Sequence, residues 1–315
     1  MRVIRGLEAV QVRRPLCLAM GVFDGVHVGH QRIISAAVRM AASAGGQPAV
    51  LTFDPHPDAI LSPQGPPPLL TTTTEKLALI SSLGISLVVL ARFDQALAEM
   101  PAETFARRVL AEQLQARCLV VGEGWRFGRQ GEGSIHLLQR MAPQLGFRVA
   151  AVRHVARGRR VVSSTWIRRL LSQGRADAAQ RCLGRHYGLT GRVVPGDGRG
   201  RQLGYPTANL DPPADKLIPG DGVYACWAGV RRLRPAACSI GVRPTFSASG
   251  ERRVEVHVLG TKRLDLLGRT LRVAFVQRLR GERRFASQEA LVRQMARDCA
   301  ETEQRLALQS PPVLV

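Results

Sequence analysis

Short apolar runs alternate with segments of helical periodicity over about the first 180 residues. This alternation constrains the fold strongly, because parallel strands need crossover connections, which are usually helices. Five runs are predicted strands: residues 16–20, 49–53, 85–90, 118–121 and 148–152. Helices are predicted at residues 31–44, from about 75, and at 102–112, 135–145, 165–171 and 175–183. The pattern therefore predicts an open, doubly wound α/β sheet of parallel strands.

The pattern changes after about Arg185, where short apolar runs are bounded by glycine and proline. Strands are predicted at residues 191–194, 222–229, 236–240, 254–259 and 270–276. This spacing favours a small antiparallel β-barrel. An amphipathic helix is predicted from residue 287 to about 308. We therefore expect two domains, residues 1–184 and 185–315.

Composition excludes several classes of protein. No apolar run reaches the ~18 residues that a membrane span needs, and the first residues lack the features of a secretory signal. The six cysteines are scattered without a CxxC pair: Cys17, Cys118, Cys182, Cys226, Cys238 and Cys299. We expect reduced thiols in a cytoplasmic protein.

The chain is strongly basic, with 45 lysines and arginines against 24 aspartates and glutamates and a formal net charge of +21. Residues 151–315 carry most of the excess, with 30 basic and 13 acidic residues. Such a balance fits nucleic acid, an acidic membrane surface or small phosphorylated substrates. Aromatic residues do not alternate with the arginines as a stacking platform for single strands requires. We attribute the excess to a G/C-rich coding sequence, with small anionic substrates contributing, and expect neither a membrane nor a nucleic-acid partner.

The segment GVFDGVHVGH, residues 21–30, lies between the first predicted strand and the first predicted helix. Its histidines His27 and His30 are three residues apart at a helix entry and face the same way. Gly25 and Gly29 let the backbone approach a phosphate chain, and the helix N-terminus adds partial positive charge. The alternative is a pair of solvated histidines in a glycine-rich turn. Residue types, spacing and context favour a site that stabilises charge on an α-phosphate and a departing pyrophosphate.

Two further segments fit the same site. Residues 163–168, SSTWIR, bring three hydroxyls and an arginine to a predicted helix start, where they can hold β- and γ-phosphates. Alone, this segment is typical of an N-cap; together with the histidine pair it indicates triphosphate binding.

Residues 52–57, TFDPHP, end the second predicted strand at the edge where open α/β sheets bind ligands. We expect His56 to contribute to substrate binding there, the alternative being a surface histidine between prolines.

A second glycine-rich segment, GDGRGRQLGYPTAN, occupies residues 196–209. It predicts a phosphate cradle of a kind other than the P-loop, because no GK[ST] follows; a glycine-rich hairpin without a ligand is the alternative. Thr207 and Asn209 offer neutral oxygens to a hard cation such as Mg²⁺. Glu255 lies in the strand pattern VEVHV, and a carboxylate at a barrel mouth suits a general base for a primary hydroxyl. A lone strand glutamate is more often solvated.

Taken in order, the motifs GVFDGVHVGH, TFDPHP, SSTWIR, GDGRGRQLGYPTANL, IGVRPTF and EVH resemble those of bacterial bifunctional riboflavin kinase/FMN adenylyltransferases, also called FAD synthetases. The resemblance runs from about residue 14 to about residue 300. HxGH is shared by many nucleotidyltransferases, whereas the PTAN string is much more specific to flavokinases.

The resemblance implies two consecutive reactions. The C-terminal module would transfer the γ-phosphate of ATP to the 5′-hydroxyl of riboflavin and give FMN. The N-terminal module would then transfer AMP from a second ATP to FMN and give FAD and pyrophosphate. Mg²⁺ is the implied cofactor, and we expect a monomer or a transient oligomer. Both steps are in-line displacements, in which positioning and charge neutralisation supply most of the rate.

The resemblance also implies roles for residues in the matching motifs. The implied catalytic residues are His27, His30, Arg168 and Glu255. Contacts to ATP or phosphate are implied for Gly21, Phe23, Asp24, Gly29, Ser163, Ser164 and Thr165, and in the second module for Gly198, Gly200, Arg201, Gly204, Thr207 and Asn209. Thr207 and Asn209 are also the implied metal ligands. Flavin contacts are implied for Phe53, Asp54, His56, Pro57 and Trp125.

The chain departs from the family at three positions. Where a Gly-Glu-Asp-Phe or Gly-Glu-Asn-Phe string is expected, it has GEGWRFG, so that Gly124 replaces a polar residue near the flavin. Downstream of Glu255, Gly260 and Leu267 stand where an aspartate and a tyrosine are expected. A protein with one active module, or one that uses a modified flavin, therefore stays an alternative. From another class, a basic nucleic-acid-binding protein is the competing hypothesis.

Overall fold

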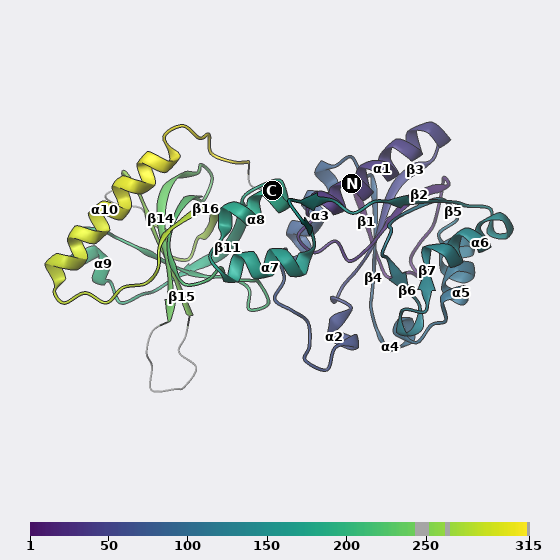
Figure 1. Ribbon diagram of the computed structural model, residues 1–315, viewed down its shortest axis with the longest axis horizontal. Helices are drawn as coiled ribbons and strands as arrows, with labels where there is room; N and C mark the ends of the chain where they lie inside the picture. Colours follow the sequence, from purple (N-terminus) through teal and green to yellow (C-terminus); the bar gives the residue numbers. More distant parts are fainter. Residues whose placement is uncertain (243–251, 262–264, 314–315) are drawn as a thin grey trace. The chain divides into compact units, whose positions relative to one another are not determined.

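The computed structural model describes residues 1–242, 252–261 and 265–313 (Figure 1). The chain forms two compact units, Met1–Ser164 and a second unit that begins at Thr165. Residues 243–246, the last four of the predicted IGVRPTF motif, lie outside the described residues.

The first unit is built on a six-stranded sheet whose neighbouring strands are all parallel, which confirms the predicted fold class. In spatial order its strands are β1 Arg2–Arg5, β4 Leu87–Ala91, β3 Gln47–Phe53, β2 Leu16–Met20, β5 Ala116–Gly122 and β8 Arg148–Val152. Both faces of the sheet are covered. Leu16, Leu18 and Met20 of β2 face one core and Ala19 faces the other, so the strand is buried on both sides.

Different helices cover the two faces. Helices α1 Val28–Ala44 and α3 Thr73–Ser82 place Ile34, Ala37 and Ile80 in one core. On the other face lie helix α6 Ile135–Leu145, the three-residue α5 Ala102–Thr104, and a π-helix, Phe105–Gln113, where the sequence predicted an α-helix over residues 102–112. The unit is completed by the short elements α2 Asp58–Leu61, α4 Gln95–Ala98, β6 Arg126–Phe127, a 3₁₀ turn Arg129–Gly131, β7 Gly133–Ser134, β9 Ala156–Arg157 and β10 Arg160–Val161.

The second unit begins in the first turn of helix α7 Ser164–Ser172, continues through α8 Ala176–Leu183, and then forms a closed barrel. In spatial order the barrel strands are β11 Tyr187–Val194, β12 Ala208–Asp211, β15 Arg252–Val258, β14 Arg234–Val242, β13 Gly222–Gly229 and β16 Thr270–Arg280. All neighbours are antiparallel. A short helix α9 Arg199–Gln202 precedes β12, and the predicted C-terminal helix is α10 Gln288–Leu306. The predicted barrel and helix are therefore confirmed.

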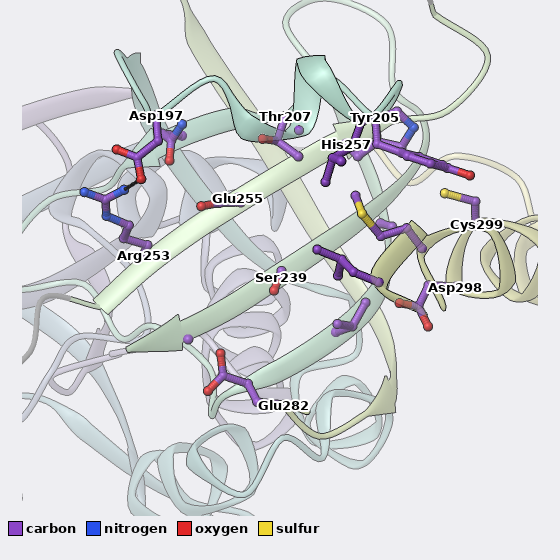
Figure 2. Close-up of a pocket in the computed structure, with 18 of the residues that line it drawn as sticks. Asp197, Tyr205, Thr207, Ser239, Arg253, Glu255, His257, Glu282, Asp298 and Cys299 are labelled. Carbon is purple, nitrogen blue, oxygen red and sulfur yellow. Dashed lines mark hydrogen bonds and ion pairs between the residues drawn. The ribbon is translucent and has the colours of Figure 1, made fainter. Parts of the chain in front are cut away.

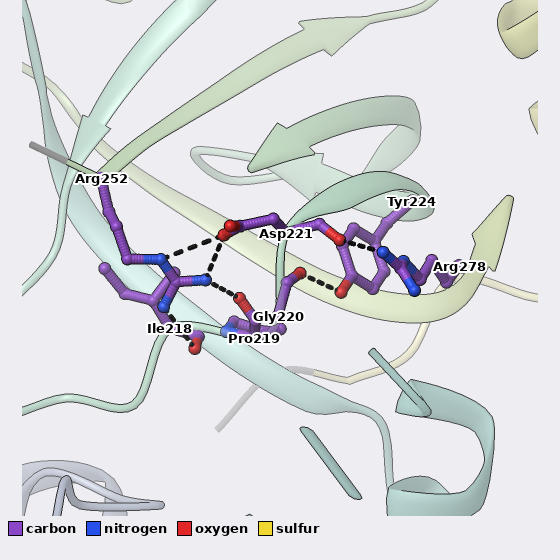
Figure 3. A network of polar contacts seen from close by, with 7 residues as sticks. All are labelled: Ile218, Pro219, Gly220, Asp221, Tyr224, Arg252 and Arg278. Carbon is purple, nitrogen blue, oxygen red and sulfur yellow. Dashed lines mark hydrogen bonds and ion pairs between the residues drawn. The ribbon is translucent and has the colours of Figure 1, made fainter. Parts of the chain in front are cut away.

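One polar network fixes the loop of residues 218–221 against the barrel (Figure 3). Arg252 at the start of β15 donates to two carbonyl oxygens of this loop, at 3.3 and 2.7 Å, and its guanidinium lies 2.6 Å from the carboxylate of Asp221. Arg278 donates to the carbonyl of Asp221, and the Tyr224 hydroxyl donates to a further carbonyl of the loop. The network holds the chain that leads into β13 beside the strand that carries Glu255.

No helix among the described residues is both long and apolar enough to cross a membrane.

Candidate active sites

The two predicted histidines lie stacked at the start of helix α1. His27 is the N-cap of this helix, and its Nδ1 accepts hydrogen bonds from the backbone N–H groups of Gly29 at 3.2 Å and His30 at 3.3 Å. The two imidazole rings are nearly parallel, with centroids 3.6 Å apart and an interplanar angle of 19°. The helix N-terminus, where anions bind readily, is therefore joined to two adjacent imidazoles.

Phe23 packs against the His30 ring of this pair. The side chain of Phe23 is fully buried, and its ring meets the His30 ring edge to face at a centroid distance of 5.2 Å. The φ angle of Phe23 is 54°, a strained value for a residue with a side chain. Burial, and to a smaller extent the nearby charges of His27 and Lys76, lower the pKa of His30 well below its usual value. His30 is therefore a neutral imidazole at neutral pH, and its buried Nδ1 has no hydrogen-bond partner in the described part of the chain.

Asp24 ties the glycine-rich turn to the loop before α3. Its buried carboxylate accepts hydrogen bonds from the N–H groups of Leu70 and Thr71, each at 3.0 Å, and from the Thr71 hydroxyl at 3.1 Å. The Thr71 hydroxyl oxygen also accepts the N–H of Gly25 at 3.0 Å. The carboxylate is thus engaged inside the protein, and a contact of Asp24 with phosphate stays a prediction. Thr71 was not among the predicted site residues.

The serine–threonine segment is divided between the two units. Ser164 belongs to the first unit, and its Oγ donates to the carbonyl oxygen of Asp24 at 2.9 Å, which brings Ser163 and Ser164 to the glycine-rich turn. Thr165 and Arg168 belong to helix α7 of the second unit. A joint action of these two residues with the histidine pair stays a prediction.

A buried lysine stands beside the predicted flavin residues at the carboxyl end of β3. The Lys76 ammonium donates to the carbonyl of Phe53 at 3.0 Å, and the side chain is buried. Burial lowers the pKa of Lys76, although the carboxylates of Asp24 and Asp54 oppose this shift. His56 accepts the N–H of Asp58 through Nδ1 at 3.1 Å, and Pro57 begins the short helix α2. Lys76 was not among the predicted site residues, and its rarity, as one of only three lysines in the chain, was the one signal for it.

At Gly124, where the family has a polar side chain near the flavin, the space beside the backbone is occupied by the imidazole of His154. A β-carbon on Gly124 would lie 3.2 Å from Nε2 of His154 and 3.4 Å from its Cε1, so the imidazole lies where a side chain at this position would begin. Glu123 orients His154 by accepting its backbone N–H at 3.2 Å. The neighbouring Trp125 stacks on Phe127 with ring centroids 4.7 Å apart.

In the second unit, most of the predicted kinase residues line one cavity of about 380 Å³ (Figure 2). Thr207 immediately precedes β12, Asn209 is the second residue of this strand, and Glu255 is the register partner of Asn209 on β15. Ser239 of β14 is the partner of Glu255 on its other side. Within the described residues, the side chains of Thr207, Asn209 and Glu255 make no hydrogen bond or ion pair, so their oxygens are available to a ligand.

The glycines of residues 196–204 shape the approach to this cavity in two ways. A β-carbon on Gly196 would overlap the amide of Asn209, and one on Gly200 would overlap the carbonyl of Tyr205. Gly198 and Gly204 instead turn the chain, with φ angles of 70° and 84°. Gly198 and Gly200 line the cavity, whereas Gly204 and the exposed Arg201 are not among its described lining residues.

The described lining residues carry more negative than positive charge. Both lining arginines are paired, Arg253 with Asp197 at 3.3 Å and Arg280 with Asp298 at 2.7 Å. Glu255 and Glu282 also line the cavity and have no paired cation in the described part of the chain. These pairs could not be predicted from the sequence, because their members lie 56 and 18 positions apart along the chain.

The excess negative charge of the cavity lining suits the binding of a divalent cation that is also coordinated by the substrate. The hydroxyl of Thr207, the amide oxygen of Asn209 and the carboxylate of Glu255 are the oxygen ligands that Mg²⁺ prefers. The described residues contain no group of three or more histidine, cysteine, aspartate and glutamate side chains that could hold a metal ion by themselves. A cation in this cavity would therefore need water or phosphate oxygens, as Mg²⁺ usually does.

The remaining departures lie outside this cavity's described lining. Gly260 follows β15 in a turn with a φ angle of 71°, and Leu267 is 61% exposed. Helix α10 instead contributes Leu291, Met295 and Cys299 to the described lining.

Two family sequence models match the chain, one for each set of motifs. The family described as FAD synthetase matches residues 10–166, and the family described as riboflavin kinase matches residues 183–306. A solved structure described as a macrolide-efflux protein from Streptococcus pneumoniae is similar over 98% of this chain and 99% of that chain, with a TM-score of 0.87 and 26% identity.

Several curated relatives described as bifunctional riboflavin kinase/FMN adenylyltransferase are similar to nearly the full chain. The protein from Escherichia coli K12 is 34% identical, with 99% of this chain and 100% of the relative covered. The protein from Pseudomonas fluorescens is 36% identical, with 92% and 93% covered. The protein from Listeria monocytogenes is 34% identical, with 90% of each covered. With both family models matched in order and relatives of this similarity covering the whole length, the chain belongs to the bifunctional riboflavin kinase/FMN adenylyltransferase family.

Proposed function

We propose that this chain makes FAD in two steps, phosphorylating riboflavin in the barrel and adenylylating the FMN product with the histidine pair of the α/β unit. The observation that best supports the kinase assignment is that Thr207, Asn209 and Glu255 line one cavity, although Glu255 is far from the other two in the sequence. We place the functional boundary between residues 184 and 185, which assigns α7 and α8 to the adenylylation module. The compact units divide earlier, at Thr165, so both helices belong to the compact unit of the barrel.

In the kinase step, Glu255 acts as the general base. Its carboxylate removes the proton from the 5′-hydroxyl of riboflavin as that oxygen attacks the γ-phosphorus of ATP, and ADP leaves. Thr207 and Asn209 orient the phosphate chain from the neighbouring strand. The glycines of residues 196–204 let the backbone approach the phosphates closely.

Mg²⁺ is the proposed cofactor of this step, with Thr207 and Asn209 as its protein ligands. When bound, it supplies positive charge that offsets the negative phosphates and the carboxylates of the cavity. The excess of carboxylates over arginines among the described lining residues supports this assignment.

In the adenylylation step, a phosphate oxygen of FMN attacks the α-phosphorus of ATP, and pyrophosphate leaves. His27, His30 and the N-terminus of α1 stabilise the charge that develops on the phosphates. Because burial keeps His30 neutral, its ring contributes a hydrogen bond rather than a full charge. Ser163, Ser164, Thr165 and Arg168 hold the β- and γ-phosphates.

The flavin of this step lies at the carboxyl ends of the sheet strands, near Phe53, Asp54, His56, Pro57 and Trp125. The His154 imidazole beside Gly124 supplies the polar group that Gly124 lacks. The replacement of a polar residue by Gly124 favours a second candidate function, in which the adenylylation module prefers a modified flavin phosphate to FMN. A comparison of kcat/KM for FMN and for ring-substituted analogues separates the two candidate functions.

Incubation of the protein with ATP, Mg²⁺ and riboflavin tests the main proposal, with FMN and FAD separated by chromatography. FMN should accumulate first and FAD second. His30→Ala should abolish FAD formation and leave FMN formation intact, whereas Glu255→Gln should abolish FMN formation and spare FAD formation from supplied FMN. Loss of both steps in either folded variant would contradict the division of labour.

Salt dependence separates this function from the nucleic-acid-binding alternative. Binding through several phosphates weakens by about one power of salt concentration for each contact. Weak retention of nucleic acid that disappears at moderate salt would agree with the enzyme, and tight sequence-specific binding would not.

A further inference from the structure

Helix α10 is buried along its second half and partly exposed along its first half. Its buried residues are Asp298, Thr302 and Leu306, which are spaced by four positions and therefore share one face. Leu306 packs in a cluster with Trp227 and other barrel residues. The first ten residues, 288–297, contribute no fully buried side chain. The helix is therefore anchored to the barrel from Asp298 onward.

The anchor begins with a buried ion pair between Arg280 and Asp298. Arg280 donates to the carboxylate of Asp298 from Nε at 3.0 and 3.1 Å and from Nη2 at 2.7 Å. The side chains are 13% and 7% exposed. Gln294, one turn earlier on the helix, donates to the same carboxylate at 2.9 Å, and the Thr302 hydroxyl donates to the carbonyl of Asp298 at 2.8 Å. A forked pair of this kind fixes orientation as well as distance.

The same pair lies at the edge of the kinase cavity. Arg280 and Asp298 are both lining residues, and Figure 2 shows Asp298 on α10, next to Cys299 and away from Thr207 and Glu255. Leu291 and Met295, from the partly exposed half of the helix, are apolar lining residues of the same cavity. Their place depends on how α10 is held at Asp298.

We propose that Arg280 and Asp298 are positioning residues for riboflavin, because they hold Leu291 and Met295 as the wall against which the flavin ring binds. This inference rests on the kinase activity proposed for the barrel. Thr207, Asn209 and Glu255 are assigned to the phosphates, so the aromatic ring is left to the apolar lining residues, among which Leu291 and Met295 belong to α10. Neither positioning residue takes part in phosphoryl transfer; they act through the helix.

Steady-state kinetics of the full chain with Asp298→Asn tests this inference, because the substitution keeps the size of the side chain and removes its charge. We expect the KM for riboflavin to rise about tenfold, the effect of losing one charge-assisted anchor. The kcat and the KM for ATP should stay within about twofold of the wild-type values. Quenching of riboflavin fluorescence, titrated without ATP, should show the same tenfold loss of affinity.

The matched control is Glu301→Gln. Glu301 pairs with Arg305 at 3.2 Å on the same helix, both side chains are at least 40% exposed, and neither residue is among the described lining residues of the cavity. This variant should bind riboflavin as the wild type does. Gln294→Ala removes one of the hydrogen bonds to Asp298 and leaves the ion pair, so it should give a smaller effect in the same direction if Asp298→Asn does not fold.

The outcomes separate this inference from the proposed function. If Asp298→Asn and Gln294→Ala bind riboflavin as the control does, the positioning role is wrong while the kinase assignment stands. If the effect falls on kcat or on the KM for ATP instead, the role is also wrong. If Glu255→Gln still phosphorylates riboflavin, the kinase assignment itself fails.

Discussion

Substitution of Gly196 by alanine tests the kinase geometry without changing Thr207, Asn209 or Glu255 themselves. The backbone of Gly196 is outside the left-handed region, so alanine is compatible with its conformation. A β-carbon there would lie 1.8 Å from Nδ2 of Asn209 and 2.6 Å from its Cγ. Because these atoms end a side chain that can rotate, we expect the fold to survive and Asn209 to move.

The size of the effect follows from that displacement. Contact between a methyl group and an amide nitrogen needs about 3.4 Å, so the Asn209 amide must retreat by about 1.5 Å. A misplacement of about 1 Å in a positioning group can cost about 100-fold in rate. We therefore expect kcat/KM for riboflavin phosphorylation to fall about 100-fold, which corresponds to about 2.7 kcal/mol.

The assay compares three chains by FMN formation from riboflavin and by FAD formation from supplied FMN. Gly196→Ala should lose the first activity and keep the second. Gly281→Ala is the control, because a β-carbon there meets nothing closer than the end of Arg278 at 3.5 Å. A Gly196→Ala protein with wild-type kinase activity would show that the position of Asn209 does not matter, and the proposed role of Asn209 would be refuted.

Four further predictions concern charge, stability and division of labour. Because folding lowers the pKa of His30, this residue should make the free energy of unfolding fall as pH drops below about 6.5, and His30→Asn should reduce that slope in urea titrations. Arg252→Ala should cost about 0.5–1.5 kcal/mol in the same titrations, because two loop carbonyls exchange a partly exposed donor for water. Removal of Mg²⁺ with a chelator should abolish FMN formation, and restored Mg²⁺ should recover it. A mixture of His30→Ala and Glu255→Gln chains should make FAD from riboflavin after a lag, since FMN can pass between molecules; a mixture in which each variant performs its own step yet makes no FAD would contradict independent sites.

The fold could be predicted from the sequence wherever burial leaves a periodic pattern. Strands β2 and β3 and helix α6 are such cases, and their predicted and observed bounds agree within two residues. Strand β1 was missed because only Ile4 of its four residues is buried. The π-helix at Phe105–Gln113 could not be told from an α-helix, since both bury side chains of one face.

The candidate kinase site could be predicted as a set of residue types but not as a geometry. Strand β12 was missed because its four residues follow a proline and include Asn209, both typical of a loop. Without this strand, the register that sets Asn209 beside Glu255 cannot be derived. Arg280 and Asp298 show the same limit, because the pairing of a strand with a helix 18 positions later depends on packing.

The basic character of the second half of the chain is not concentrated at the kinase cavity. Both described arginines that line the cavity are neutralised by aspartates, and Glu255 and Glu282 add negative charge, so a polyanionic substrate meets net repulsion from these residues. The described lining of this cavity therefore does not account for the arginine excess, and a contribution from small anionic substrates stays a prediction. The same repulsion is the physical basis of the Mg²⁺ dependence that we expect. A cation held between a triphosphate and the two unpaired carboxylates would offset their repulsion and would withdraw charge from the phosphorus under attack.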